Sequence, residues 1–229
     1  MAAPGHLPTE AEIGAWPDFT PRAPIRVLVS ACLTGVACGV DGTSYGAPFQ
    51  HISRILDRPN VQVVAFCPED FAFGTPRETP DIHEGNGGDV LDGRARVRSE
   101  SGQDWTGPML RAALAMLELA QDNRVHLALQ TDISAACGSQ VIYLGARSAH
   151  VYQAGHGVCT ALLVRHGFKV VSQRDHRTLG YLLHKLDPTF RPVAAVRDHH
   201  ETDWYVEHLA HDSRKAALAE APPIQRQTC

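Results

Sequence analysis

The chain has 229 residues, 44% of them hydrophobic and 20% charged, which are ordinary proportions for a globular protein. Its formal net charge of -4 gives no long-range attraction to polyanions, so we predict no nucleic-acid partner. No stretch approaches the ~18 apolar residues of a membrane span, and the N-terminus carries no export signal. These features predict a cytoplasmic protein with no membrane partner.

The first part of the chain predicts an arm and then a βαβ unit. Residues 1–24 contain several prolines and no sustained hydrophobic period, which predicts an N-terminal arm that is irregularly packed or disordered. The continuous apolar run over 26–31 predicts a buried strand. A helix over 49–56 and a second strand over 62–66 follow at the spacing that a parallel crossover requires.

The middle of the chain predicts an alternation of helices and strands. Residues 70–107, rich in glycine, proline and charge, predict a long loop that holds short strands such as 95–98. Beyond this loop the predicted elements are helices over 106–121 and 157–166, and strands over 125–129, 141–144 and 168–172. The pattern predicts an α/β fold with a mainly parallel sheet, a Rossmann-like three-layer domain over 25–176.

Residues 177–229 predict a helical C-terminal extension for packing or oligomerisation, with helices over 179–186 and 202–219. This extension is rich in histidine, including His199, His200, His208 and His211. Because neither a nearby cysteine nor an HExxH pattern accompanies them, solvated side chains are favoured here over a metal site. The oligomeric state is left open.

The cysteines indicate reduced thiols that the fold must bring together. The chain contains Cys32, Cys38, Cys67, Cys137, Cys159 and Cys229. Without an export signal a disulfide framework is not expected, and no CxxC pair indicates a zinc ribbon or a thioredoxin-type redox motif. Any metal site must therefore combine cysteines that are distant in sequence.

Three of these thiols follow predicted strands. Cys32 and Cys67 lie at strand ends, and Cys137 lies in the loop after the third strand, among small residues that let the backbone approach a bulky ligand. Ligands of open α/β sheets bind beyond the carboxyl ends of the strands, so the three thiols are expected to converge on a soft metal ion or an iron–sulfur cluster. The alternative is that each is a small buried hydrophobe, which is favoured for Cys159 and Cys229. Cys38 is an additional candidate ligand.

The segments around these thiols resemble a known family. VSACLTG around Cys32, CPE at Cys67 with a following TPR, and SAACGS around Cys137 are similar to the three signature segments of the thiouracil and thiouridine desulfidases, over roughly 26–172. The resemblance implies a desulfidase with a 4Fe–4S cluster on Cys32, Cys67 and Cys137, whose fourth iron captures the substrate's sulfur. Water then replaces the sulfur of a thiolated pyrimidine base or nucleoside without net redox change.

The resemblance also implies catalytic roles for two residues. Glu69, close to Cys67, would move protons, and Ser134 matches a family serine that hydrogen-bonds substrate or water. Without the resemblance, a solvated loop carboxylate and a turn cap are the favoured interpretations of these two side chains. Phe71 and Phe73 are candidates for stacking on a nucleobase, and Arg77 for holding an anionic or carbonyl group.

Two other classes of function stay open at this point. A non-catalytic sensor or carrier would bind a cluster or metal on the same cysteines. A plain Rossmann-like binding domain would bury them as hydrophobes, although the chain lacks the GxGxxG that a dinucleotide-binding domain carries after its first strand.

Overall fold

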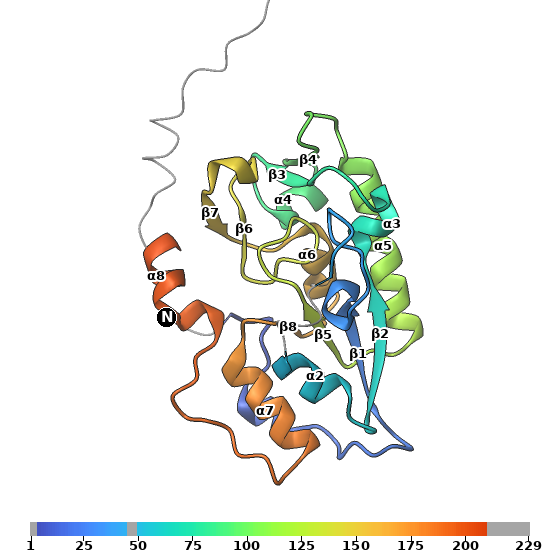
Figure 1. The fold of residues 1–229 in the computed structure, drawn as a ribbon, viewed down its shortest axis with the longest axis vertical. Coiled ribbons are helices and arrows are strands. Elements are labelled where there is room, and N and C mark those ends of the chain that lie inside the picture. The colour runs from blue at the N-terminus through green and yellow to red at the C-terminus, as the bar shows by residue number, and fades with distance from the viewer. Residues whose placement is uncertain (1–3, 45–49, 210–229) are drawn as a thin grey trace, which may run out of the picture.

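The computed structural model describes residues 4–44 and 50–209, and its centre is a parallel four-stranded sheet (Figure 1). The strand order is β2-β1-β5-β8. The strands are β1 (Ile25–Ser30), β2 (Val61–Phe66), β5 (Leu127–Gln130) and β8 (Val170–Ser172). The predicted parallel sheet is confirmed, and the apolar runs of β1, β5 and β8 are buried as expected for strands covered on both faces.

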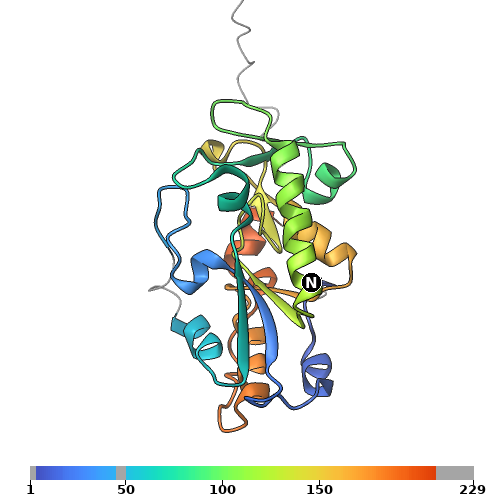
Figure 2. The ribbon, with the colours of Figure 1, turned by 90° about the vertical axis from the view of Figure 1, so that its right-hand side faces the viewer.

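Helices cover both faces of this sheet, which confirms the Rossmann-like three-layer architecture. Val27 and Val29 of β1 pack with α2 (Gln50–Leu56) and α7 (His176–Leu186), whereas Leu28 packs on the other side. That other side is covered by α5 (Thr106–Asp122) and α6 (Val158–Arg165). Figures 1 and 2 show the two helical layers with the sheet between them. These four helices were predicted from the sequence and are confirmed. Gly167, with a φ of 81°, follows the C-cap of α6.

The region predicted as a long loop is more ordered than expected. It contains α3 (Pro68–Phe73), β3 (Asp81–His83), α4 (Gly87–Leu91) and β4 (Arg96–Arg98). Hydrophobic periodicity does not reveal such short elements, because they contain too few residues to show a period. Their ends are set by local caps, such as the Asn86 capping box of α4. Only the strand predicted over 95–98 is confirmed, as β4.

The strand predicted over 141–144 forms, but outside the central sheet. It is β6 (Val141–Tyr143), which pairs antiparallel with β7 (Tyr152–Ala154). The small sheets β3–β4 and β6–β7 lie together beyond the carboxyl ends of the central strands (Figure 1).

Both terminal regions contain helices. In the predicted irregular arm, α1 (Glu10–Ala15) is stabilised by a Thr9–Glu12 capping box and buries Ile13. After α7 come the 3-10 helix η3 (His199–Glu201) and α8 (Asp203–Leu209), the start of the helix predicted over 202–219. The rest of that helix, His211 and Cys229 lie outside the described residues. Within the described part, no helix is long and apolar enough to cross a membrane.

Candidate active site

A cavity opens where β1, β2 and β5 end, and the three predicted thiols line it. Cys32 lies in the 3-10 helix η1 (Ala31–Thr34) directly after β1, and Cys67 is the N-cap of α3 directly after β2. Cys137 lies in the loop after β5. The cavity measures about 620 Å³, counting the mouth that opens to solvent. The fold therefore brings Cys32, Cys67 and Cys137 to one place, as the sequence predicts.

Each thiol is held by a defined contact. Cys32 Sγ lies 3.1 Å from Thr131 Oγ1, and Cys67 Sγ accepts a hydrogen bond of 3.4 Å from the Asp70 amide. Burial raises the pKa of all three thiols above the ordinary value. Because metals bind the thiolate, a metal or cluster would displace a proton from each.

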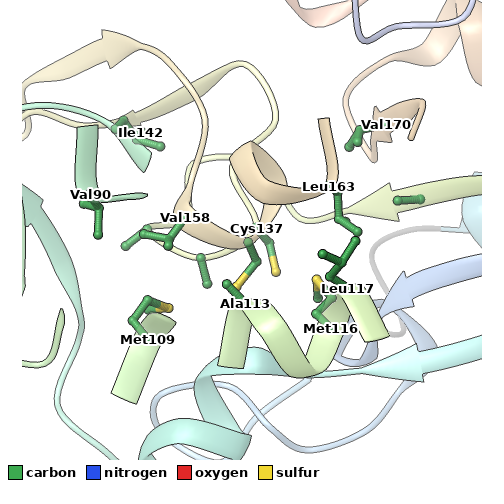
Figure 3. Packing of buried hydrophobic residues seen from close by; sticks show 14 of the residues in the cluster. Val90, Met109, Ala113, Met116, Leu117, Cys137, Ile142, Val158, Leu163 and Val170 are labelled. Carbon is green, nitrogen blue, oxygen red and sulfur yellow. The ribbon is translucent and has the colours of Figure 1, made fainter. Parts of the chain in front are cut away.

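Cys137 is fixed by tight packing of its loop on α6. The Val158 and Cys159 amides at the start of α6 donate to the carbonyls of Ala135 and Ala136 at 2.8 and 3.0 Å. A Cβ on Gly157 would lie 2.5 Å from the Ala136 carbonyl oxygen. The small residues here thus serve the contact of the loop with α6, in addition to any ligand. Figure 3 shows Cys137 among side chains of α5 and α6.

The thiols fit an iron–sulfur cluster better than a single ion. Among the residues the structure describes, no group of three or more histidine, cysteine, aspartate or glutamate side chains is close enough to hold one metal ion. In a 4Fe–4S cluster each cysteine binds a different iron, so its ligands surround a larger object. Three free thiols line one open cavity, a donor set that suits a cluster, and they are not gathered closely enough to bind a single ion.

Glu69 and Ser134 contact one another at the wall of this cavity. Ser134 Oγ donates to Glu69 Oε1 at 3.1 Å and accepts from the amides of Ala136 and Cys137 at 3.2 and 3.0 Å. Glu69 Oε2 accepts from Arg77 at 2.9 Å. The Glu69 side chain is 14% exposed, so it is not a solvated loop carboxylate. Ser134 does cap its turn, and it reaches Glu69 as well.

Arg77 has a different partner from the one predicted. Its guanidinium is 3% exposed and donates to Glu69, to the carbonyls of Cys38 and Gly74, and to Thr75 Oγ1. These bonds orient Glu69. Arg77 also lines the cavity, and its Nε is buried without a hydrogen-bond partner among the described residues, so the expected contact with a ligand stays a prediction. Cys38 lines the cavity too, and burial raises the pKa of its thiol to about 12.

A profile of the family described as 2-thiouracil desulfurase matches residues 27–175. The chain belongs to this family. The uncharacterized protein YbbK of Bacillus subtilis (strain 168) is 35% identical over 150 residues, which cover 65% of this chain and 96% of YbbK. A solved structure, the [4Fe-4S]-dependent thiouracil desulfidase TudS, is 36% identical with a TM-score of 0.52, covering 65% of this chain and 90% of TudS. These matches confirm the predicted desulfidase family, the class of enzyme and the fold.

Two aromatic residues close to the cavity do not line it. The described residues that line the cavity include neither Phe71 nor Phe73. Phe73 stacks on Trp105 with ring centroids 4.1 Å apart, and Phe71 is 57% exposed beside Phe66. The expected stacking of a nucleobase on these two rings is therefore not supported, because Phe73 packs on the core and Phe71 contacts the lining residue Phe66 without lining the cavity itself.

Sequence reasoning missed Asp132 and misjudged the tail histidines. Asp132 lies in the loop shortly after β5, lines the cavity and is 3% exposed. The rule that found the cysteines, polar groups at the carboxyl ends of strands, would have found it. His199 and His200 are 2% and 5% exposed, so the expectation of solvated side chains was wrong for them. His199 reaches back to the cavity wall, where its Nδ1 bonds Asp132 Oδ2 at 2.7 Å.

Proposed function

We propose that this protein is a cytoplasmic desulfidase that hydrolyses the thiocarbonyl of a thiolated pyrimidine base or nucleoside, such as thiouracil or thiouridine. Cys32, Cys67 and Cys137 would hold a 4Fe–4S cluster. The observation that carries the proposal is that these three thiols and the hydrogen-bonded pair Glu69 and Ser134 line one cavity. The name of TudS, a [4Fe-4S]-dependent thiouracil desulfidase, supports the same cofactor and substrate class.

The lining of the cavity suits a small thiocarbonyl compound. The three thiols lie there together with Glu69 and Ser134, so a molecule that enters meets soft sulfur ligands and hydrogen-bonding groups in one place. When bound, the cluster would supply an open, soft coordination position for the sulfur of the thiocarbonyl. The reaction needs no external oxidant or reductant, since water supplies the oxygen for carbon and both protons for the departing sulfide.

The protein's own groups would move those protons. Glu69, held by Arg77, accepts a proton from the attacking water and returns it to the leaving sulfur. The Ser134 oxygen is fixed by two backbone amides, so its hydroxyl hydrogen is directed to Glu69 and can pass to substrate or water when either enters. Both groups stand beside the Cys137 loop, next to the proposed ligand set.

The decisive experiment is anaerobic purification followed by counts of iron and acid-labile sulfide and a visible spectrum. About four of each per chain, with the broad brown absorption of such clusters, is the expected result. The loaded protein is then given thiouracil and thiouridine, and release of sulfide and of the oxo product is measured. A colourless protein, even after reconstitution, would refute the cluster. A loaded protein that turns over neither substrate would point to the sensor or carrier alternative.

A further inference from the structure

The loop that carries Ser134 and Cys137 is organised by one buried carboxylate. Asp132 Oδ1 accepts from the backbone amides of Ile133, Ser139, Gln140 and Val141, at 3.0, 2.9, 3.1 and 3.1 Å. Amides from both ends of the loop therefore bond to the same oxygen atom. Both proposed functional residues of the loop lie between these anchor points.

This loop contains a backbone conformation that needs support. Ile133 has a φ of 58°, in the left-handed region that a β-branched residue adopts only under constraint. It lies between Asp132 and Ser134, so its conformation sets the direction in which Ser134 leaves the strand end. The four bonds to Asp132 Oδ1 supply the constraint, and they depend on how the Asp132 carboxylate is itself oriented.

The second oxygen of Asp132 is held by a residue from outside the family segment. His199 Nδ1 lies 2.7 Å from Asp132 Oδ2, and the two side chains are 3% and 0% exposed. Burial acts to raise the pKa of Asp132, but the bonds from His199 and from the backbone outweigh it, so the pKa lies below its ordinary value. An ionised Asp132 only accepts, hence His199 Nδ1 donates. The family match ends at residue 175, before His199.

His199 is in turn fixed by its own segment. Its ring stacks on Trp204 at 5.3 Å, and its backbone amide donates to Asp175 Oδ1 at 3.2 Å. The neighbouring Asp198 accepts from the amide and the hydroxyl of Thr178 in α7, at 2.9 and 2.8 Å. These contacts hold η3 against the start of α7. The His199 ring itself is held between Trp204 and Asp132.

We propose that His199 is a positioning residue of the active site: through Asp132 it fixes the loop that presents Ser134 and Cys137. The segment around η3 then completes a site whose other residues all come from the family segment. The consequence for catalysis rests on the proposed function, whereas the consequence for the loop does not.

The test compares His199→Phe with His199→Asn in the full-length protein. Phenylalanine keeps an aromatic ring against Trp204 but removes the donor, whereas the amide nitrogen of asparagine takes approximately the place of Nδ1. A matched control is Thr178→Val, which removes the hydroxyl bond to Asp198 but keeps the amide bond, so η3 stays attached to α7 and His199 keeps its contact with Asp132. Thermal unfolding of all three variants shows how far each destabilises the fold.

The first measurement is hydrogen exchange of the segment 133–141 in protein without a cluster, and it does not depend on activity. We expect exchange at least about tenfold faster in His199→Phe, with His199→Asn and Thr178→Val near wild type. Unchanged exchange in His199→Phe would overturn the proposal. So would an equal acceleration in Thr178→Val, because the effect would then come from general loosening of the segment.

The second measurement uses the reconstituted protein. Iron release to a chelator should be about tenfold faster in His199→Phe, and kcat per bound cluster about tenfold lower, with both restored by His199→Asn. If the wild type binds no iron but the exchange result is as expected, the proposed function fails and the role of His199 in the loop stands. If iron release, kcat and exchange are all unaffected, the role of His199 is refuted while the desulfidase is retained.

Discussion

Glu69 and Arg77 form a nearly buried ion pair, and its remaining hydrogen bonds explain why it is tolerated. Taking two charges out of water is costly unless further bonds satisfy both groups. Here Ser134 donates to Glu69, and two carbonyls and a hydroxyl accept from Arg77, whose Nε alone stays without a partner among the described residues. The result is a carboxylate held rigidly at the cavity wall beside the thiols, which is what a proton-transferring group requires.

Glu69→Gln should separate catalysis from cofactor binding. The amide has nearly the same shape but cannot accept and return a proton, so turnover of thiouracil should fall by about 100-fold or more, with iron content near wild type. Asp70→Asn, at the adjacent acid that the described cavity lining does not include, is the control and should stay within a few-fold of wild type. Unchanged desulfidation by Glu69→Gln would remove Glu69 from the mechanism.

Among the cysteines, position in the fold distinguishes candidate ligands from core residues. Cys67→Ser should lower bound iron at least about tenfold and bleach the visible spectrum, because the hard hydroxyl is a poor iron ligand. Cys159 is fully buried in α6, and the described cavity lining does not include it. Cys159→Ala should therefore keep the cluster. Equal iron content in the two variants would contradict the assignment of Cys67.

At the scale of elements, the site depends on how closely α6 approaches the loop that carries Cys137. The amides at the start of α6 donate to the carbonyls of this loop, and a side chain on Gly157 would collide with the loop backbone. The loop is consequently held from two directions, by α6 on one side and by Asp132 on the other. Such double support is a means of presenting a ligand from irregular backbone with little freedom.

Gly157→Ala tests this contact. The added Cβ would lie 2.5 Å from the Ala136 carbonyl oxygen, so loop and helix must separate, and we expect the free energy of unfolding to fall by about 1–3 kcal/mol with weaker iron retention. Gly14→Ala in α1 is the matched control, since nothing lies within 4 Å of its added Cβ, and it should be neutral or slightly stabilising. Urea denaturation of both variants measures the difference. Equal free energies of unfolding for the two variants would show that the loop can move away from α6 at little cost.

At the scale of the whole molecule, local sequence patterns predicted the central architecture and the meeting of the three thiols. The buried strands and long helices have strong hydrophobic patterns, which predict the sheet and its helical layers. Because parallel strands end at the same edge of the sheet, the cysteines that follow them are expected to meet there. Short capped elements such as α1 and α4 carry too few residues for a period. The contact of His199 with Asp132 joins residues far apart in the chain, so no local pattern contains it.

The N-terminal arm is also attached to the core by contacts between residues far apart in the chain, which no local pattern contains. One of these contacts should make the stability of the protein depend on pH. His6 is 8% exposed, its ring packs edge-on against that of His156 at 4.6 Å, and its carbonyl accepts from the Val170 amide of β8 at 3.0 Å. Burial, reinforced by His156, lowers the pKa of His6 to about 3. The folded protein therefore keeps His6 neutral at pH values where the unfolded chain protonates it.

The contribution of neutral His6 to the free energy of unfolding is fully present above the unfolded-state pKa of about 6.5. It is lost progressively as the pH falls from 6.5 toward the folded-state pKa of about 3. Between pH 8 and pH 5 the expected loss from His6 alone is roughly 2 kcal/mol, since each pH unit below 6.5 costs about 1.4 kcal/mol. His6→Phe should lose that much less stability over this range than wild type does. At pH 8, where His6 is neutral in both states, the difference between the two proteins reports packing only and serves as the internal reference. Parallel curves for the two proteins from pH 8 to pH 5 would mean that the arm leaves the core before the protein unfolds.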